Sequence, residues 1–558
     1  MREKRPPPYS LLAASLGNSA DPLLQNPRFL VIFLPAAGGF LPFFPGHAMI
    51  KTASAIGTGD RLIYPKGLPP AAAAGMSKPM NFISLPFFLF FPAAVLGYHL
   101  LPRRARAVWL LLASWVFYLF SGAAGFPFLL GAILASYAAG RLMEAGHRRR
   151  AAAAAVVLCA GTLFVLKYLQ FFLSLAAEAL NAWGLAVSSP ALRLLLPAGI
   201  SFYLFQAIGY VIDVYRGDQP AQRSLVRHAL FLSFFPQLLS GPIARAPQLM
   251  PQLEDPPDVT WDGLRQGSFR FLWGAFKKLV IADRLAVLVN TVYAAPGDFG
   301  RLQVLAAMLA FSLQIYCDFS AYSDMALGTA QAMGFTLTEN FRSPYFSRTI
   351  QEFWRRWHIS LSSWFRDYLY IPLGGSRRGR RAKYRNLLIV FAVSGLWHGA
   401  GLTFLVWGLL HGAYQVIGAV TAPWRDRLRT RLGLRRESLP VRIFQTGCTF
   451  SLVTLAWVFF HAADLSAALA VFSRLLSGPL WVPLSAGLDR WDCLAASAAL
   501  LVLLAAEVSE ARMPLSRRWL EAPAPVRWIT ALGLLLAAAV LGCYGPGYDA
   551  QAFIYFKF

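Results

Sequence analysis

Long apolar stretches recur along the chain from about residue 81 onward, and short polar segments separate them. A run of roughly 20 apolar residues is long enough to cross a bilayer as a helix. The pattern predicts an all-α polytopic membrane protein with about 11 to 13 membrane helices. The shorter runs are expected to be re-entrant or interfacial, because backbone at membrane depth must be satisfied by protein or water. The runs after the first five lie at about residues 269–292, 304–333, 387–397, 402–420, 441–460, 465–476, 493–506 and 529–544.

The loops that join the first five apolar runs alternate between basic and uncharged. The runs lie at about residues 82–101, 104–120, 127–147, 151–180 and 194–212. Basic residues follow the first, third and fifth runs, at Arg103, Arg104 and Arg106, at Arg148, Arg149 and Arg150, and at Arg216, Arg223 and Arg227. The segments 121–126 and 181–190 carry no charge. Cytoplasmic loops collect Lys and Arg, so the arginine loops are predicted to be cytoplasmic and the chain to enter the first span from outside.

Composition supports a membrane protein over a basic soluble one. The chain is 57% hydrophobic and only 14% charged, whereas a soluble domain is about a quarter charged. The formal net charge of +25 could indicate nucleic-acid binding. Its arginines, however, form short clusters between apolar runs, so we expect a membrane and no nucleic acid as the partner. The five cysteines form no C-x-x-C pair, which argues against a disulfide framework or a structural zinc site.

Residues 1–79 differ from the rest of the chain. They hold scattered Pro, Gly and Ala and one short apolar run, residues 29–44, which two prolines and two glycines interrupt. This run makes a poor span and a poor signal peptide. We expect a disordered extension or a start-site overcall, with translation beginning at Met80 or Met76 and a membrane domain over residues 80–558. An extra membrane anchor is the alternative.

Polar side chains inside apolar runs are costly in a membrane, so they indicate function or a buried pair. Gln206 and Asp213 lie in one such helix, where a hydrogen bond between helices and an acid at the cytoplasmic end explain them. Asp318 and Asp324 lie six residues apart, which places them on different helix faces. They are therefore expected to be two separate anchors, and both ion pairing and a functional role remain open.

A tryptophan- and arginine-rich segment covers residues 340–379. Its apolar side chains recur at helical spacing and predict an amphipathic helix near the membrane surface: Trp354, Trp357, His358, Leu361 and Phe365. Arg355, Arg356 and Arg366 point in other directions. A basic run follows at Arg377, Arg378, Arg380, Arg381, Lys383 and Arg385. It is either a cytoplasmic anchor or a landing site for a phosphorylated donor, since guanidinium groups suit phosphate.

The next segment, residues 393–412, places His398 between apolar runs in the sequence Trp-His-Gly. A neutral imidazole is well suited to accept a hydroxyl proton near pH 7. His358, His398 and His411 fall within some fifty residues, which favours chemistry over packing without settling it. The spacing suggests no metal site. No Gly-rich nucleotide loop or G-x-S-x-G elbow occurs, so an acyl-serine enzyme is not indicated.

Several segments together resemble one family. They read LPAGISFYLFQAIGYVIDVYRG from Leu196, FKKLVIADRLA from Phe276, DFSAYSDMALG from Asp318, ENF from Glu339, EFWRRWHISLSSWFRDYLYIPLGG from Glu352, SGLWHGAGLTFLVWGLLHG from Ser394, AWVFF from Ala456 and the terminal FIYFKF. The chain from Met80 resembles a membrane-bound O-acyltransferase (MBOAT) of the bacterial alginate O-acetyltransferase type. The resemblance implies a helical fold around a central tunnel, with His398 as the catalytic histidine and His358 as a second functional position. It gives His411 weaker support.

The resemblance also implies the substrates and partners. The donor would be a cytoplasmic thioester, acetyl-CoA, with no bound cofactor. The acceptor would be a hydroxyl of an exported polysaccharide such as alginate, cellulose, another exopolysaccharide or peptidoglycan, and an extracytoplasmic acetyltransferase partner would complete transfer. The site would lie in the bacterial inner membrane. Donor-binding or tunnel-lining roles are expected for Trp354, Arg355, Arg356, Trp357, Arg366, Asp318, Asp324 and Trp397.

Two other functions compete with an acyltransferase. A transporter or flippase would use intramembrane Asp and His as a substrate or proton path, but it predicts inverted repeats, and none is visible. A scaffold would recruit a separate acyltransferase and would not need His358 or His398 for chemistry.

Overall fold

The computed structural model describes residues 80–192, 194, 196–510, 513–543 and 553, and within these residues the secondary structure is helical and has no strand. The predicted extension, residues 1–79, lies outside the described residues. The first helices are α1 (Leu85–Leu100), α2 (Arg103–Gly122), α3 (Phe126–Glu144), α4 (Arg148–Leu163), α5 (Leu169–Ala182), α6 (Ile200–Arg216), α7 (Leu225–Ser233), α8 (Phe235–Leu238), α9 (Ala246–Glu254) and α10 (Trp261–Phe276). These helices confirm the all-α prediction for the first half of the chain.

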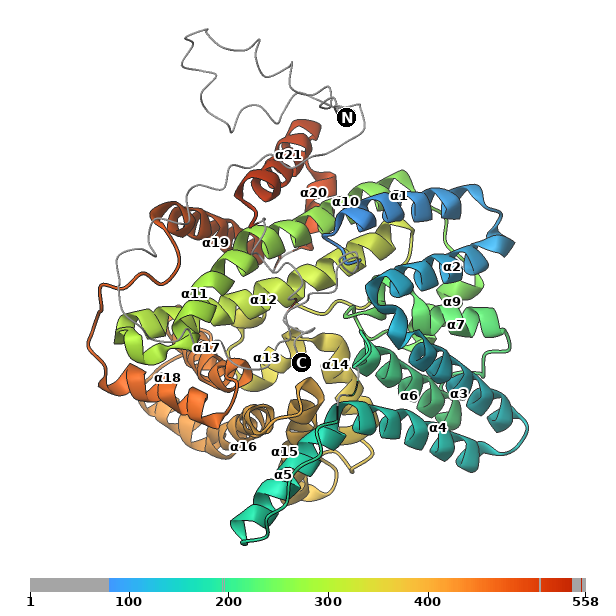
Figure 1. Ribbon diagram of the computed structural model, residues 1–558. Helices are drawn as coiled ribbons and strands as arrows, with labels where there is room; N and C mark the ends of the chain where they lie inside the picture. Colours follow the sequence, from blue (N-terminus) through green and yellow to red (C-terminus); the bar gives the residue numbers. More distant parts are fainter. Residues whose placement is uncertain (1–79, 193, 195, 511–512, 544–552, 554–558) are drawn as a thin grey trace, which may run out of the picture. The chain divides into compact units, whose positions relative to one another are not determined.

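The second half is helical as well (Figure 1). Its helices are α11 (Asp283–Ala294), α12 (Arg301–Ala332), α13 (Ile350–Arg356), α14 (Ile359–Phe365), α15 (Gly379–His398), α16 (Leu402–Arg431), α17 (Leu439–His461), α18 (Leu465–Ser477), α19 (Arg490–Glu510), α20 (Leu515–Glu521) and α21 (Ala524–Leu541). Short 3-10 segments are η1 (Ala123–Gly125), η4 (Pro296–Asp298) and η5 (Pro344–Phe346). Figure 1 shows α10 alongside α12 and α15 alongside α16, and both pairs are in extensive contact.

Seven helical stretches of the described chain are long and apolar enough to cross a membrane. They are Arg103–Glu144, Arg148–Ala182, Arg301–Ala332, Leu402–Arg431, Leu439–His461, Arg490–Glu510 and Ala524–Leu541. The apolar helices Leu85–Leu100 and Leu465–Ser477 are shorter. This number is below the predicted 11 to 13. One reason is that Arg103–Glu144 joins two predicted spans, α2 and α3, into a single stretch of 42 residues.

The other reason is that some apolar runs form helices that are short or interrupted. Helix α6 takes up the predicted run 194–212, but it has only 17 residues, and most of its side chains are buried. The run 269–292 is divided between α10 and α11, with charged residues at the break. Such runs are apolar because protein surrounds them, and hydropathy alone does not distinguish that case from lipid.

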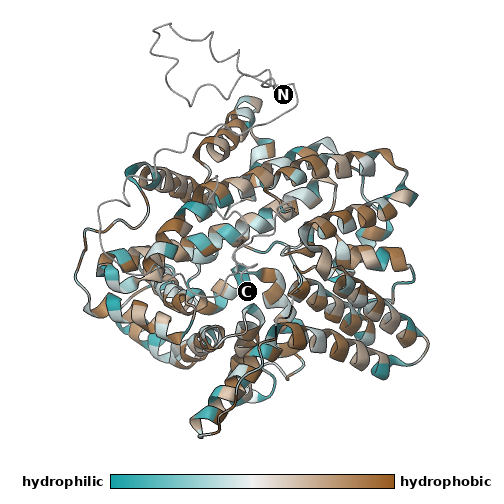
Figure 2. Cartoon of the chain, viewed as in Figure 1, coloured by the Kyte–Doolittle hydropathy of each residue, from teal (hydrophilic) through white to brown (hydrophobic). Residues whose placement is uncertain are grey.

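The apolar outer surface fits a lipid environment. Val157, Ile529 and Val540 expose 69%, 71% and 74% of their surface, and many other large apolar side chains are similarly exposed. Figure 2 shows hydrophobic residues covering most of α2, α3 and α4. Exposed apolar area on this scale would make a soluble protein aggregate. Together with the helical stretches above, it makes this a multi-pass membrane protein.

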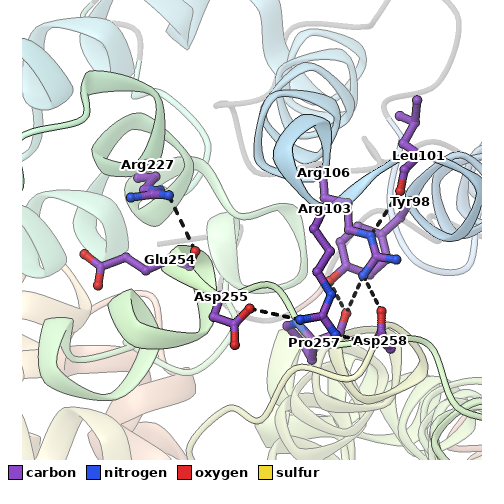
Figure 3. A network of polar contacts seen from close by, with 9 residues as sticks. All are labelled: Tyr98, Leu101, Arg103, Arg106, Arg227, Glu254, Asp255, Pro257 and Asp258. Carbon is purple, nitrogen blue, oxygen red and sulfur yellow. Dashed lines mark hydrogen bonds and ion pairs between the residues drawn. The ribbon is translucent and has the colours of Figure 1, made fainter.

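A polar network ties the first arginine loop to the connection between α9 and α10 (Figure 3). Arg103 pairs with Asp258 at 2.6 Å, and Arg106 pairs with the same carboxylate at 2.7 Å. The Tyr98 hydroxyl donates to the carbonyl oxygen of Pro257 at 2.5 Å. These contacts place the α1–α2 loop and the α9–α10 connection on one face of the molecule, the face that the arginine pattern predicts to be cytoplasmic.

Three π-helical segments interrupt otherwise α-helical runs: η2 (Phe164–Tyr168), η3 (Lys277–Ala282) and η6 (Arg366–Tyr370). Each contains charged residues that contact other parts of the protein, Lys167 in η2, Lys277 and Lys278 in η3, and Asp367 in η6. A π turn holds one extra residue and is frequent at functional sites in helices. The charged groups of these apolar helices thus concentrate where the helix is locally widened.

Candidate active site

His358 lies between α13 and α14 in a left-handed backbone conformation, with φ 44° and ψ 56°. The segment was predicted to be one amphipathic helix that lies near the membrane surface or dips into it, and the prediction of a single continuous helix is wrong. Two seven-residue helices meet here instead, and Trp357 and His358 are fully buried between them. A non-glycine residue in this conformation costs about 1–3 kcal/mol and persists only where its surroundings enforce it.

The segment around Asn340 enforces this conformation. Its backbone brackets the histidine, because Ile359 N donates to Asn340 O at 3.0 Å and Arg342 N donates to Arg356 O at 3.0 Å. The buried Asn340 side chain accepts from the Ser360 hydroxyl at 2.7 Å and donates to Ser323 Oγ at 3.2 Å. The position of His358 is therefore set by groups outside its own helices.

His398 is the last residue of α15, after which the chain turns through Gly399 and Gly401 into α16. The two helices cross closely at Gly395 and Gly408, where an added Cβ would collide with the backbone carbonyl of Phe404 or Phe391, respectively. Small residues permit such close approach of membrane helices. This crossing fixes the end of α15, and with it His398, against α16.

The rings of His358 and His398 lie 6.4 Å apart between centroids. The Trp397 ring lies 6.0 Å from His358 and 4.9 Å from His398. Other aromatic rings complete the surroundings, with Phe202 and Phe319 against His358 and Trp407 and Phe460 against His398. Both histidines are buried, so this part of the protein holds two imidazoles in an apolar, water-poor environment.

Burial keeps both imidazoles neutral. It lowers the pKa of His358 to about 3, and it lowers the pKa of His398 well below the usual value, with smaller contributions from His358, Lys167 and His411. Neither residue lies in one of the seven spanning stretches. A neutral imidazole can accept a proton, which is the state that a general base requires.

His411 lies deeper along the same aromatic cluster. Its Nδ1 accepts from the Trp354 indole at 3.3 Å, and its ring lies 5.2 Å from that of Trp407. Trp357 belongs to this cluster too, with its ring 5.1 Å from that of Trp457. Trp354 and Trp357 therefore belong to the aromatic cluster around His411, whereas the Trp397 ring lies close to both site histidines.

Asp318 and Asp324 form separate ion pairs, as their spacing predicted. Asp318 pairs with Lys278 at 2.5 Å. Asp324 accepts from Lys277 at 2.6 Å and from Arg270 at 3.0 Å, and Arg270 in turn pairs with Glu339 at 2.5 Å. Both acids thus connect α12 to α10 and η3. A neutralised acid buried in a pair is a structural anchor and a poor general base.

A cavity of about 500 Å³ opens beside the Asn340 segment. Its lining includes Arg342, Arg355 and Arg356, with Arg356 paired to Glu352 at 2.6 Å. A volume of this size suits a small-molecule ligand. Arg366 lies elsewhere, paired with Asp367 at an exposed position, and the basic run from Arg377 to Arg385 does not line the cavity.

The remaining polar residues of α6 have structural partners. The Gln206 amide donates to Phe231 O at 2.8 Å, and the Tyr368 hydroxyl donates to Asp213 Oδ1 at 2.6 Å. The interhelical hydrogen bond predicted for Gln206 is confirmed. In the described part of the chain, no group of three or more His, Cys, Asp or Glu could hold a metal ion.

Two residues that matter here escaped the sequence interpretation. Lys167 Nζ donates to Trp397 O at 2.7 Å and to His398 O at 3.2 Å. Asn340 appeared in the Glu-Asn-Phe segment but had no assigned role. A lysine alone in the apolar stretch 151–180 was the available signal for Lys167, whereas no local pattern distinguishes Asn340.

Comparison with known proteins identifies the family. The family model described as MBOAT, membrane-bound O-acyltransferase, matches residues 219–456, which include both histidines. A Pseudomonas putida protein named as a probable alginate O-acetylase is 40% identical over 402 residues, covering 71% of this chain and 79% of the relative. The chain belongs to the membrane-bound O-acyltransferase family. It is thus an O-acyltransferase enzyme, which rules against the transporter and scaffold alternatives.

More distant MBOAT relatives act on other polymers. A Helicobacter pylori protein named peptidoglycan O-acetyltransferase is 36% identical over 427 residues, covering 70% of this chain and 78% of the relative. A Streptococcus thermophilus protein named teichoic acid D-alanyltransferase is 29% identical over 283 residues, covering 47% of this chain and 67% of the relative. This MBOAT chain is therefore similar to enzymes with different acyl groups and different acceptors.

Proposed function

We propose that this MBOAT enzyme transfers an acetyl group from cytoplasmic acetyl-CoA to hydroxyls of an exported bacterial polysaccharide. The neighbouring pair of buried imidazoles, His358 and His398, carries the proposal. The acetyl donor is supported by the two O-acetyl-transferring relatives, which are more similar and cover more of the chain than the D-alanyltransferase. Alginate is the first acceptor to test, and cellulose, another exopolysaccharide or peptidoglycan are the alternatives.

In the proposed reaction, His398 takes the proton of the acceptor hydroxyl. The hydroxyl oxygen then forms a bond to the thioester carbonyl carbon, the carbon–sulfur bond breaks, and the proton passes to the leaving thiolate. General-base assistance of this kind contributes about 10²–10⁴-fold to rate. His358 orients the acceptor from the opposite side. The surrounding aromatic rings exclude water, which would otherwise hydrolyse the thioester.

The donor site in this proposal is the cavity beside Asn340. Arg342, Arg355 and Arg356 in its lining supply guanidinium groups that suit the phosphates of coenzyme A. Its lining also includes Phe341, which follows Asn340 in the segment that holds His358. We keep Arg355 and Arg356 as donor-binding candidates. Arg366 and Asp318 do not line the cavity and are dropped from that role, whereas Asp324 lines it and stays a candidate.

The decisive experiment replaces each site histidine separately. Expression of His398→Ala or His358→Ala in cells lacking the native enzyme should abolish or strongly reduce the acetyl content of the exported polymer. His147→Ala is the matched control, because His147 is exposed at the start of α4. Membrane protein level is measured for each variant. Normal acetylation by His398→Ala would refute the assignment of the base.

Two further parts of the proposal concern the chain's setting. We place the enzyme in the bacterial inner membrane, with an extracytoplasmic acetyltransferase that completes transfer. Incorporation of acetyl groups into polymer by vesicles that lack this partner would contradict the need for it.

We also propose that residues 80–558 suffice for activity. Met80 N donates to Phe120 O at 3.0 Å and Ser121 Oγ donates to Met80 O at 2.7 Å, so the described chain is anchored from its first residue. A chain starting at Met80 should restore acetylation fully.

A further inference from the structure

Lys167 contacts the end of the helix that carries His398. It lies in η2, the π-helical segment between α4 and α5. Its ammonium donates to the main-chain oxygens of Trp397, at 2.7 Å, and His398, at 3.2 Å. These are the last two residues of α15. A lysine from an otherwise apolar helix thus reaches about 230 residues along the chain to one helix terminus.

The contact satisfies a physical need of α15. The last carbonyls of a helix lack intrahelical partners, and the C-terminus of the helix dipole is negative. A cation at this position therefore stabilises the helix end. Glycine follows at position 399 and an open turn leads into α16, so no further turn of α15 can provide these hydrogen bonds. Lys167 acts as the cap.

The described residues place no acid beside Lys167. Among the described residues, no carboxylate forms an ion pair with Lys167, and its nearest ring contacts are Trp397 and Tyr168 at 5.9 and 6.0 Å. An unpaired lysine in a membrane-spanning stretch is costly and therefore calls for a function. Its positive charge acts on His398, where it disfavours a second positive charge on the imidazole.

We propose that Lys167 is a positioning residue for the acyl-transfer reaction, which fixes the backbone of His398 and helps to keep its imidazole in the neutral, proton-accepting form. The proposal rests on the role of His398 proposed above. Among the described residues, the ionisable side chains that act on that imidazole include Lys167 from η2, His358 from the start of α14, and His411 from α16.

Substitutions of Lys167 should have effects that depend on the charge and the length of the new side chain. In Lys167→Met, the main-chain oxygens of α15 lose their cap and His398 its neighbouring cation. Displacement of a catalytic group by about 1 Å can cost 10²-fold in rate, so kcat should fall about 10- to 100-fold while KM for acetyl-CoA stays unchanged. Because His398 then protonates more easily, the acid limb of the rate profile should move to higher pH. Lys167→Arg keeps a cation and donors and should retain most activity.

The experiment uses vesicles from cells that express the full chain in place of the native enzyme. Labelled acetyl-CoA is added, and incorporation into polymer is measured against pH. Gln170→Met is the matched control: this residue lies on the adjoining α5 and bonds to Ser174 and Leu192 instead of α15. It should leave the pH profile unchanged. Folded protein is quantified for every variant by size-exclusion in detergent.

The outcomes separate this proposal from the assignment of the base. Unchanged kcat and pH profile in Lys167→Met, with His398→Ala inactive, would overturn the role of Lys167 alone. Equal losses in Lys167→Arg and Lys167→Met without a pH shift would overturn it as well, because packing would then explain both. Activity in His398→Ala would instead refute the underlying proposed function. A pH shift in Lys167→Met that Lys167→Arg reverses would establish the role.

Discussion

The rings of His358 and His398 lie 6.4 Å apart between centroids, although 40 residues and the whole of α15 separate them along the chain. Different contacts hold each of the two histidines in place. The backbone of His358 is bracketed by the Asn340 segment, and the backbone of His398 is held by Lys167 and by the crossing of α15 with α16. Substitutions in these supports should therefore affect catalysis without touching either imidazole.

Gly408→Ala should damage both stability and activity. The added methyl group would collide with the main-chain oxygen of Phe391 and push α15 away from α16. Overpacking of this kind costs about 1–3 kcal/mol. Gly418→Ala, on the same helix with no atom near its Cβ position, is the control and should be neutral. Thermal unfolding in detergent and polymer acetylation measure the effect, and equal behaviour of the two variants would contradict the close crossing.

Asn340→Ala should loosen the segment that holds His358. Removing the amide leaves the Ser360 and Ser323 hydroxyls without their partner in a buried environment. An unsatisfied buried polar group costs about 1–3 kcal/mol. Asn181→Ala removes a comparable side chain that bonds to Val187 at an exposed position, and it should change little. We expect a lower unfolding temperature and a lower kcat for Asn340→Ala only; a kcat equal to that of the control would show that His358 is placed by other contacts.

Asp324→Asn should be strongly destabilising. The substitution removes the carboxylate that Arg270 and Lys277 share, and it leaves buried positive charge uncompensated. Breaking a buried pair from one side costs about 3–5 kcal/mol. Asp262→Asn disrupts an exposed pair with Arg265 on the same helix, α10, and should cost much less. Unfolding in detergent compares the two. Full stability of Asp324→Asn would mean that the carboxyl is not ionised in the folded protein.

Stability should decline on acidification because of buried neutral histidines. Burial lowers the pKa of His228 to about 3, and its ring bonds to Ser136 at 2.8 Å. Its folded pKa lies below its unfolded value near 6.5, so the stability it contributes is complete above that pH and is lost as pH falls. Between about pH 7.5 and pH 5 the loss is about 2 kcal/mol for this one residue.

His228→Gln tests this linkage. The variant should show a smaller difference in unfolding free energy between the two pH values than the wild type. His147→Gln, at an exposed position, should keep the wild-type difference. An undiminished pH effect in His228→Gln would mean that His228 takes up its proton without unfolding.

The sequence predicted the class of fold well, but it predicted poorly where individual helices are interrupted. Runs of apolar residues identified α2, α3, the α4–α5 stretch and α6, because bilayer thickness sets the length of such runs. Periodicity failed at Trp357 and His358, where contacts from Asn340 and Arg342 override the local helix preference. Long-range hydrogen bonds of this kind leave no periodic pattern in one sequence.

The two histidines of the candidate site were predicted from the sequence, but the residues that hold them in place were not. The resemblance supplied His358 and His398, and the structure brings them together. Asp318 and Arg366 do not line the cavity, whereas Asp324 lines it and is paired with Lys277 and Arg270. Lys167 was read as part of an ordinary span because its partners are backbone carbonyls, which every residue possesses and which no sequence motif marks.

The π-helical segments have a consequence for how such enzymes diverge. One additional residue in a turn rotates all later side chains by about 100° relative to those before it. Deleting one residue within residues 164–168 would restore a regular helix and turn Lys167 away from α15, although the hydropathy of the stretch would hardly change. Relatives that lack one residue in any of these three segments would therefore be expected to have different contacts around the active site, even where overall sequence identity is high.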